Sequence, residues 1–409
     1  MNKNLLLIGN TLDMYDILIY VSFSSYLNLL FFSKENSNFS ILVTLLVLFV
    51  SYATRILGGI IFGVMSDKLG RKLSLSMSSF FLAICTFLII LIPTYQSIGI
   101  LSTFIFIFFR LVQGICFGGE VSNLIVYILE HGQDKYLSSA KITASSTLGA
   151  LLATGTSILM SHWFSHHDIL DYAWRVPFII SLLSVCTSIY IRNKMEESQL
   201  FLQNKRQQKK IKMAIHFPTI VKITLAIASG SCSFYIINAS ISFLNTKYDV
   251  NSIYIQLFCS TFLFILILIS GLVSRKMERR GISILKLGIL MLIFLSIPLF
   301  YIIAQKEIIS SIVALLIFII ITSMVQANIP LLALSLTKFS GRSLNLSVGY
   351  NLGIVIFGSS APYFIHLFSQ QSIGGIGYYV TIISLISYLV IVFALPKTRN
   401  TRHTITAKL

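Results

Sequence analysis

The stretch Gly63-Val-Met-Ser-Asp67-Lys68-Leu-Gly70-Arg71-Lys72 places four charged side chains and two glycines between two long apolar segments. Charge at this density is costly in hydrocarbon, so we expect the stretch to form a loop outside the lipid. Asp67 and Arg71 stand one helical turn apart, where they are able to pair or to cap a neighbouring helix. A degraded copy recurs 208 positions later as Gly271-Leu-Val-Ser274-Arg275-Lys276-Met-Glu278-Arg279-Arg280. That distance is about half of the 409-residue chain, which predicts a membrane protein built from two similar halves.

The composition agrees with a membrane protein. Charged residues are 11% and hydrophobic residues 56% of the chain, whereas soluble domains contain about 25% charged residues. Apolar runs long enough to cross a bilayer as helices recur from end to end, and alternating strands are absent. We therefore expect an all-α integral membrane protein with twelve transmembrane helices in two six-helix halves, and we see no removable signal sequence at its start.

Hydropathy predicts twelve spans, an even number that puts both termini on one side of the membrane. The predicted spans are 9–32, 41–66, 73–93, 99–128, 139–163, 173–192, 217–245, 253–274, 282–303, 309–336, 344–368 and 375–396. The corresponding domains are an N-terminal half at 1–192, a basic cytoplasmic linker at 193–216, a C-terminal half at 217–396 and a cytoplasmic tail at 397–409.

The distribution of Lys and Arg predicts the orientation. The loops on the side of the termini hold 24 of these residues, counting the run from Arg192 to Lys212, and the opposite loops hold four. Because cytoplasmic loops collect basic residues, we expect both termini in the cytoplasm. The net charge of +17 is explained in the same way, so we expect no nucleic-acid partner. The linker is expected to attract anionic lipid headgroups.

The metal-binding residue types give no sign of a cofactor. The five cysteines lie in apolar segments without CxxC spacing and are expected to be packing residues. His162, His166 and His167 cluster at an external helix end but lack a second set of ligands, so we expect no metal there.

Ionisable side chains inside the first span need a reason, because burying them in a bilayer is costly. Asn10, Asp13, Asp16 and Tyr20 lie in this span, and the two aspartates are three residues apart on neighbouring helix faces. Carboxylates in a partly dry cavity suit a reversible proton carrier. The alternative is that Asp13 lies at the membrane interface and serves only insertion or packing.

Two further spans carry buried charge. Arg55 lies in the second span, and Arg110, Gln113 and Glu120 lie in the fourth. Arginine does not lose its proton, so each must meet a carboxylate or an anionic substrate. Arg110 and Glu120 are about 15 Å apart along one helix, and we expect them to face different partners, with the first-span aspartates as candidates. The alternative is a pair of structural interhelical salt bridges.

The fourth span contains a glycine pattern, and the eleventh span contains polar residues among glycines. Gly114, Gly118 and Gly119 form a small-xxx-small pattern, which favours close helix packing over ligand contacts. In the eleventh span, Tyr350 and Asn351 stand near several glycines. A broken helix there would expose backbone groups for substrate binding, and a packing kink is the alternative.

These segments resemble a known superfamily. Gly63 to Lys72 resembles the loop between spans two and three of the major facilitator superfamily, G-x-x-x-D-[RK]-x-G-R-[RK], which is complete here. Arg110-Leu-Val-Gln113-Gly114 resembles the fourth-span motif R-x-x-Q-G of that superfamily.

Further segments are similar to the metabolite:proton symporter family, which includes proline/betaine, α-ketoglutarate, shikimate and citrate carriers. Gly9-Asn10-Thr-Leu-Asp13-Met-Tyr15-Asp16 resembles G-N-x-x-E-W-Y-D, and Gly118-Gly119-Glu120 resembles G-G-E. Trp174-Arg175-Val-Pro177-Phe178 and the run from Tyr190 to Ser198 resemble W-R-x-P-F and Y-x-R-x-x-x-E-[ED]-[ST]. Ser347-Val-Gly349-Tyr350-Asn351 with Phe357-Gly358 and Pro362 resembles G-Y-N…F-G-G-x-x-P.

The resemblance implies proton-driven uptake of a small carboxylate-bearing metabolite by alternating access, and no enzymatic activity. The residue pattern and the resemblance together assign three groups of candidate residues. The proton-coupling candidates are Asp13, Asp16 and Glu120. The substrate-binding candidates are Asn10, Tyr20, Arg55, Arg110, Gln113, Tyr350 and Asn351. The candidates for a conformational latch are Gly63, Asp67, Gly70, Arg71 and Lys72.

Some positions depart from the family pattern. Asp13 stands where Glu is usual, Arg275 stands where Asp67 stands in the first loop, and Glu278 replaces a glycine. The stretch Val-Ser-Asn after Glu120 is also unlike the family, so the sequence does not predict which metabolite is carried.

We expect a monomer in a bacterial cytoplasmic membrane, with the lipid bilayer, a small molecule and a proton as its partners. The alternatives are a uniporter or exchanger of the same fold, and a sensor homologue that has lost transport. A membrane enzyme acting on lipid-linked substrates would need polar external loops, and no external loop predicted here much exceeds ten residues.

Overall fold

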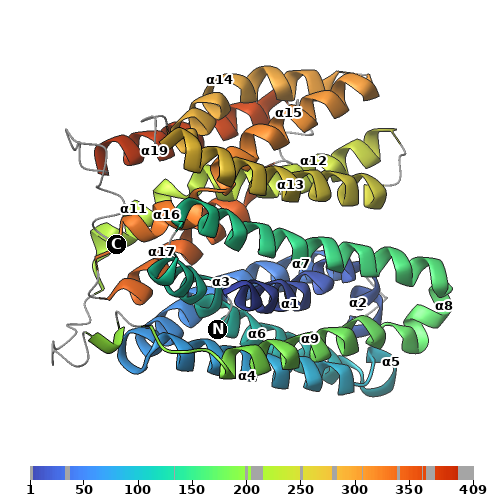
Figure 1. Ribbon diagram of the computed structural model, residues 1–409. Helices are drawn as coiled ribbons and strands as arrows, with labels where there is room; N and C mark the ends of the chain where they lie inside the picture. The colour runs from blue at the N-terminus through green and yellow to red at the C-terminus, as the bar shows by residue number, and fades with distance from the viewer. Residues whose placement is uncertain are drawn as a thin grey trace. The chain divides into compact units, whose positions relative to one another are not determined.

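The structure is a computed structural model, and it is helical throughout the residues it describes (Figure 1). The described residues are 3–32, 37–132, 134–198, 201–203, 215–248, 252–278, 283–305, 307–338, 341–361, 363–364 and 374–394. Most of the predicted linker and the whole predicted C-terminal tail lie outside these ranges.

The chain divides into two compact units. Unit 1 comprises Met1–Leu124 and Ser145–Ile211, and unit 2 comprises Ile125–Ala144 and Lys212–Leu409. Two long helices, α6 (Ile100–His131) and α7 (Lys135–Trp163), therefore contribute residues to both units. The division at 192 and 217 expected from hydropathy stays a prediction.

Unit 1 also holds the helices that precede α6 and follow α7. These are α1 (Lys3–Ser22), α2 (Ser24–Phe31), α3 (Ser37–Leu69), α4 (Arg71–Leu91), α5 (Tyr95–Ile98), α8 (His166–Asp168), the π-helix η1 (Ile169–Ala173) and α9 (Arg175–Asn193). Helix α9 packs against both α1 and α4, and α3 packs against α4 (Figure 1).

Unit 2 holds the remaining helices. These are α11 (Phe217–Ala226), α12 (Ala228–Tyr248), α13 (Ser252–Glu278), α14 (Ile284–Ala304), α15 (Ile308–Gln326), α16 (Ile329–Ser335), α17 (Arg342–Gly353), the π-helix η2 (Ile354–Gly358) and α19 (Gly374–Ala394). Helix α14 packs against α15 and α19, and α11 packs against α17 (Figure 1).

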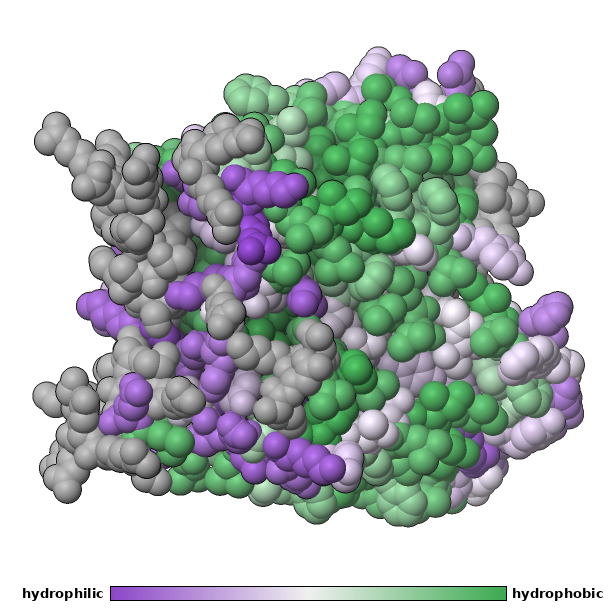
Figure 2. All heavy atoms as spheres, in the orientation of Figure 1, coloured by the Kyte–Doolittle hydropathy of each residue, from purple (hydrophilic) through white to green (hydrophobic). Residues whose placement is uncertain are grey.

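Each of the twelve predicted spans coincides with one of these helices or with a consecutive pair. Nine helices among the described residues are long and apolar enough to cross a membrane, and the bent pair of α11 and the start of α12 makes a tenth. Figure 2 shows hydrophobic side chains over the middle of the helices and hydrophilic ones toward their ends. Exposed Phe87 and Leu183 in unit 1 and exposed Phe294 and Phe393 in unit 2 agree with a lipid-facing surface.

Several spans are broken, among them the seventh and the eleventh. The two parts of the seventh span meet at Ile227 with a bend of 40°. Residues Ile354–Gly358 in the eleventh span form a π-helix after Gly353, within the stretch where the sequence predicted an irregular helix. Because π-helices often mark functional sites, this segment remains a candidate for substrate binding, as its polar residues predicted.

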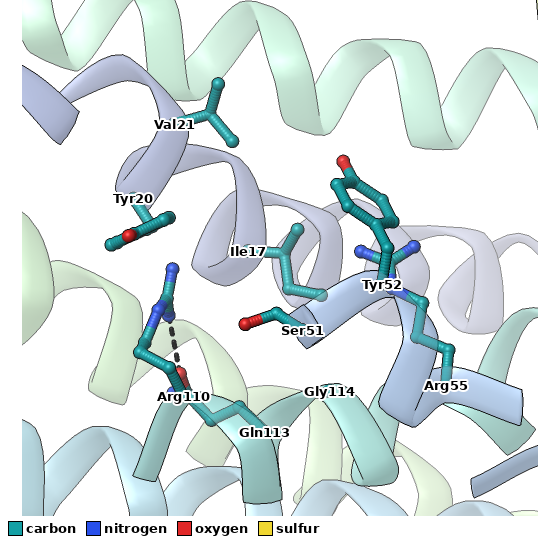
Figure 3. Close-up of a pocket in the computed structure, with 9 residues that line it drawn as sticks. All are labelled: Ile17, Tyr20, Val21, Ser51, Tyr52, Arg55, Arg110, Gln113 and Gly114. Carbon is teal, nitrogen blue, oxygen red and sulfur yellow. Dashed lines mark hydrogen bonds between the residues drawn. The ribbon is translucent and has the colours of Figure 1, made fainter. Parts of the chain in front are cut away.

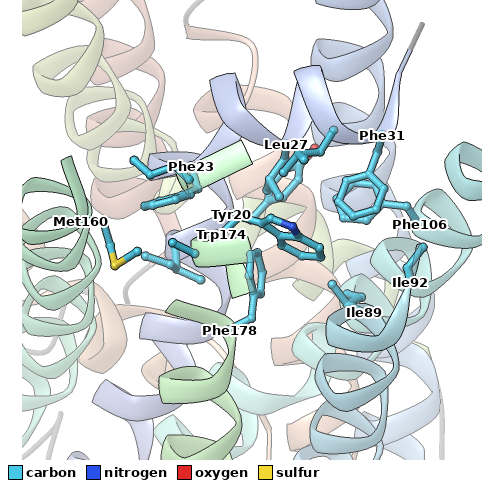
Figure 4. Packing of buried hydrophobic residues seen from close by; sticks show 14 of the residues in the cluster. Tyr20, Phe23, Leu27, Phe31, Ile89, Ile92, Phe106, Met160, Trp174 and Phe178 are labelled. Carbon is cyan, nitrogen blue, oxygen red and sulfur yellow. The ribbon is translucent and has the colours of Figure 1, made fainter. Parts of the chain in front are cut away.

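A cluster of buried hydrophobic side chains, many of them aromatic, forms one hydrophobic core of unit 1 (Figure 4). The Phe31 ring stacks on Phe106 at a centroid distance of 4.4 Å and meets Trp174 edge-on at 5.3 Å. Trp174 and Phe178, which the sequence places in one motif, are both buried here. The motif therefore supplies packing contacts between α9 and the helices around it.

Glycines bring α3 and α6 into backbone contact. A Cβ atom at Gly118 would lie 2.0 Å from the Arg55 carbonyl oxygen, and one at Gly58 would lie 1.8 Å from the Ile115 carbonyl oxygen. Gly114 is similarly crowded by the Ser51 carbonyl, at 2.4 Å. This confirms the prediction that the fourth-span glycines serve close helix packing.

Candidate functional site

The loop between α3 and α4 is built around Gly70. This residue has a φ of 116°, a conformation that glycine adopts without strain. The Glu197 carboxylate accepts hydrogen bonds from the backbone N–H groups of Arg71 and Lys72, at 3.0 and 3.1 Å. An acidic side chain at this position satisfies free donors at the start of α4 and complements the helix dipole. A Cβ atom at residue 70 would lie 2.2 Å from the Glu197 carboxylate, so glycine is also required for the close approach.

The latch residues Asp67 and Arg71 are buried, although the sequence predicted a loop. The Arg71 guanidinium lies over the Phe201 ring, 5.0 Å from its centroid. Phe201 and Glu197 both follow α9 in the chain, so the start of the linker is fixed to this loop. Gly63 and Lys72 lie in α3 and α4 at either side of the turn.

The second copy of the loop makes a different contact. Arg275, at the position of Asp67, forms an ion pair with Asp134 at 2.9 Å within unit 2. Arg342 forms a buried ion pair with Glu130 at 3.2 Å in the same unit. The change from Asp to Arg is therefore matched by an acidic partner, and Arg279 and Arg280 lie outside the described residues.

Three charged side chains meet in the interior of unit 1. The Arg192 Nη2 atom lies 2.5 Å from Asp13 Oδ2 and 2.6 Å from Glu120 Oε1. The guanidinium also donates to the Leu75 carbonyl at 2.9 Å and to the Ser79 hydroxyl. All three charged side chains are at most 1% exposed. We call Asp13, Glu120 and Arg192 the charged triad.

The triad corrects one part of the sequence analysis. Arg192 was counted among the basic residues of the cytoplasmic loops, yet it belongs to α9 and is buried, as is Arg342. Arg71 is buried as well, and removing these three residues from the count of 24 leaves 21 basic residues against four, so the asymmetry stays. Glu120 pairs with Arg192, which also binds Asp13 of the first span.

Asp16 lies in a separate network of neutral donors. Its carboxylate accepts hydrogen bonds from the hydroxyl groups of Thr86, at 3.0 Å, and of Ser181. The Gln113 amide donates to Asp16 at 3.4 Å and to Thr86 at 2.9 Å. The Gln113 oxygen in turn accepts from Arg110 Nη1 at 2.5 Å. Gln113 therefore connects Arg110 to Asp16 in place of a direct ion pair.

A small pocket lies beside this network (Figure 3). It is lined by α1, α3 and α6 through Ile17, Tyr20, Val21, Ser51, Tyr52, Arg55, Arg110, Gln113 and Gly114. Its cavity volume of about 30 Å³ is room for about two water molecules. Four of the predicted substrate-binding residues meet here, namely Tyr20, Arg55, Arg110 and Gln113.

The two arginines of the pocket each lie directly against an aromatic ring. The Arg110 guanidinium lies 3.7 Å from the centroid of the Tyr20 ring, and that of Arg55 lies 4.2 Å from the centroid of the Tyr52 ring (Figure 3). Neither arginine forms an ion pair with an acidic side chain in the part of the chain that the structure describes. The Arg55 Nε and the Tyr20 hydroxyl have no hydrogen-bond partner among the described residues. The pocket therefore offers unused donors and positive charge.

Three predicted substrate-binding residues lie elsewhere. The Asn10 amide donates to the hydroxyl groups of Ser145 and Ser146, at 2.8 and 3.0 Å, and so ties α1 to α7 within unit 1. Tyr350 and Asn351 lie in α17 of unit 2, where the Asn351 amide donates to the Ser347 carbonyl at 2.8 Å. Substrate binding by these three residues stays a prediction.

The sequence analysis missed several residues of these networks. Thr86 and Ser181 look like ordinary small residues of apolar helices, and Glu197 looks like one of many linker charges. Asn123 donates to the Ser74 hydroxyl at 2.9 Å and to the Phe62 carbonyl at 3.3 Å, so the unusual Val-Ser-Asn stretch ties α6 to α3 and α4. A signal for Arg192 and Glu197 was present, because both belong to the quoted motif from Tyr190 to Ser198.

Comparison with known proteins agrees with the resemblance. A putative proline/betaine transporter of Staphylococcus aureus (strain COL) is 25% identical over 403 residues, which cover 94% of this chain and 86% of that protein. A protein of the same description from Staphylococcus haemolyticus is 26% identical over 400 residues, covering 94% and 85%. The proline/betaine transporter of Escherichia coli (strain K12) is 29% identical over 199 residues, covering 48% of this chain and 40% of that protein.

Solved structures with the same fold support the architecture. The structure of the proton:xylose symporter XylE bound to 6-bromo-6-deoxy-D-glucose has a TM-score of 0.82 at 13% identity, covering 96% of this chain and 95% of that one. The human organic anion transporter MFSD10 has a TM-score of 0.70 at 12% identity, covering 95% and 98%. These likenesses confirm the predicted all-α fold of twelve membrane helices.

The family itself follows from a match to most of the chain. A model of the Major Facilitator Superfamily matches residues 14–346, which include the loop at Gly63 to Lys72, Glu120 and Arg192 of the charged triad, and the pocket. The superfamily and the relatives point to a transporter and not to an enzyme. This chain is a multi-pass membrane protein that belongs to the Major Facilitator Superfamily.

Proposed function

We propose that the protein is a secondary active transporter that moves a small carboxylate-bearing metabolite together with a proton by alternating access. The observation that carries the proposal is the pair of guanidinium groups, Arg55 and Arg110, that line one pocket without a direct ion pair to an acidic side chain among the described residues. A buried or half-buried cation calls for a counter-charge, which a substrate can supply.

The chemistry of the pocket suits a carboxylate. A guanidinium group binds a carboxylate through two parallel hydrogen bonds, and it cannot lose its proton to escape the charge. The aromatic rings of Tyr20 and Tyr52 hold the two guanidinium groups by cation–π contacts. A substrate carboxylate arriving between them would complete their hydrogen bonding.

The coupling to protons is proposed on the three buried carboxylates, Asp13, Asp16 and Glu120. A proton on such a group removes a buried charge, which makes it easier for the loaded site to pass the membrane midplane. Asp16 is joined to the pocket through Gln113 and Arg110, so a change in its charge reaches the substrate site through two hydrogen bonds.

For the transported substrate we propose a chemical class and not a single compound. The printed names of the relatives favour proline or betaine, and the family resemblance also includes di- and tricarboxylates. A uniporter or exchanger with the same fold is the nearest alternative, and a sensor that has lost transport is another.

We also propose a bacterial cytoplasmic membrane as the location, with both termini in the cytoplasm and a monomer as the working unit. The excess of basic residues on one side supports the orientation. The loop at Gly63, Asp67, Gly70, Arg71 and Lys72 is proposed as a conformational latch. Its fixation to Glu197 supports a mechanical role away from the substrate.

The test is counterflow in proteoliposomes that contain the purified protein. Liposomes loaded with unlabelled proline, betaine, α-ketoglutarate or shikimate are diluted into the labelled compound, and its entry is followed. The proposal expects at least one compound to enter faster than into empty liposomes, and it expects Arg110→Gln to reduce the entry at least tenfold. Lys222→Gln is the matched control, because Lys222 is an exposed side chain outside the pocket. Entry that Arg110→Gln leaves unchanged would contradict the proposed site.

A further inference from the structure

The charged triad has an unbalanced charge. It contains two carboxylates, Asp13 and Glu120, and one guanidinium, Arg192, whose single Nη2 atom binds both. If both carboxylates were ionised, the group would carry a net charge of −1 in a place that is at most 1% exposed. An uncompensated buried charge is strongly unfavourable.

The hydrogen bonds of the triad are also incomplete. The outer oxygens, Asp13 Oδ1 and Glu120 Oε2, are buried and have no donor among the described residues. The two carboxyl groups lie within hydrogen-bonding reach of each other. Two carboxylates this close do not both ionise readily, and one proton between them supplies the missing hydrogen bond.

We propose that Asp13 and Glu120 share one proton over Arg192, and that this shared proton is the one the transporter exchanges. With the proton bound the triad is neutral, and when it leaves the triad carries one negative charge. Arg192 is a positioning residue, because it holds both carboxyl groups on one nitrogen atom and exchanges no proton itself.

The neighbouring groups agree with this assignment. Helix α4 faces the triad with uncharged groups, the Ser79 hydroxyl and the Leu75 carbonyl, and Ser188 of α9 donates to Asp13 at 2.8 Å. The other titratable side chains nearby are Asp16 on α1 and the two thiols Cys116 on α6 and Cys85 on α4. No second cation contacts either carboxylate in the described part of the chain.

Asp16 differs from the pair in its partners. Two hydroxyl groups and one amide donate to it, so an ionised Asp16 has its hydrogen bonds satisfied by neutral groups. It needs no shared proton to complete them. The shared proton is therefore assigned to the triad, and Asp16 keeps its own set of donors.

The inference rests on the proposed proton-coupled transport for its role, but its test needs no substrate. The full-length protein in lipid nanodiscs is examined at pH 7 by infrared spectroscopy, which distinguishes a protonated carboxyl group from a carboxylate. The wild type minus Asp13→Asn difference and the wild type minus Glu120→Gln difference are each expected to contain the loss of one protonated carboxyl band. In both variants the remaining carboxylate pairs one-to-one with Arg192 and needs no proton.

Three further variants sharpen the test. Asp16→Asn is the matched control and should keep the full band, whereas Arg192→Gln should double it because both carboxyl groups then lack a cation. Arg192→Lys should restore the single band. The proposal is overturned if the wild type has no such band, if either Asp13→Asn or Glu120→Gln retains it, or if Asp16→Asn loses it. A band that behaves as expected in a protein that fails the counterflow assay would uphold the shared proton and overturn the proposed transport together with the proton's role in it.

Discussion

The contact between α3 and α6 predicts a large effect from one added methyl group. In Gly118→Ala the new Cβ atom would lie 2.0 Å from the Arg55 carbonyl oxygen, 2.7 Å from its carbon and 2.8 Å from the Gly59 nitrogen. All three atoms belong to the backbone, so no side chain is able to turn away. Ordinary contact begins at 3.4 Å, so the helices must separate by about 1.4 Å, an overpacking that costs about 1–3 kcal/mol.

The matched control is Gly155→Ala in α7. A Cβ atom there meets nothing within 4 Å, and replacing glycine by alanine inside a helix stabilises by up to about 1 kcal/mol. Thermal unfolding of the purified proteins in one detergent, followed by intrinsic fluorescence, compares the two. We expect the midpoint to fall for Gly118→Ala and to stay or rise for Gly155→Ala. If Gly118→Ala unfolds at the same temperature as the wild type or above it, the close approach of these helices is wrong.

Four other variants test the cap and the pocket. Glu197→Ala removes the carboxylate that accepts from the first N–H groups of α4, so it should destabilise by about 0.5–2 kcal/mol, measured as a lower midpoint in the same unfolding assay. Ser165→Ala, at the exposed cap of α8, is the comparison for loss of a cap elsewhere. Tyr20→Phe removes a hydroxyl without a partner among the described residues and should change stability by less than about 0.5 kcal/mol, whereas Tyr20→Leu loses the contact with Arg110 and should cost about 0.5–2 kcal/mol. Equal midpoints for the Phe and Leu variants would contradict the cation–π contact.

The fold was predictable from the sequence because hydrocarbon imposes a simple rule. A chain that crosses the membrane must satisfy its backbone hydrogen bonds within each span, so long apolar runs become helices. The glycines of the fourth span likewise predicted close packing, because a small residue at every fourth position marks the helix face that contacts another helix. The residue types and spacing of the loop from Gly63 to Lys72 were enough to indicate the superfamily.

The site was predictable only in part, because its partners come from different helices. Arg192 follows an apolar run and precedes many basic residues, so its position in the sequence resembles that of a loop charge. Only the packing of α9 against α1 brings it to Asp13. Thr86 and Ser181 are common residue types in membrane helices, and nothing in their local sequence points to Asp16. The pocket arginines were found because an arginine inside a span is rare enough to need an explanation.

The central claim is that a carboxylate substrate and a proton cross together, and one measurement tests it most directly. Proteoliposomes are loaded with a pH-sensitive dye. The compound that is active in counterflow is then added outside, with no pH difference and no electrical potential imposed across the membrane. The account predicts that the lumen acidifies as the compound enters, that a protonophore abolishes the signal, and that Asp13→Asn lowers it at least tenfold while counterflow continues. Entry of the compound with no change in internal pH in the wild type would contradict proton coupling and leave a uniporter or an exchanger.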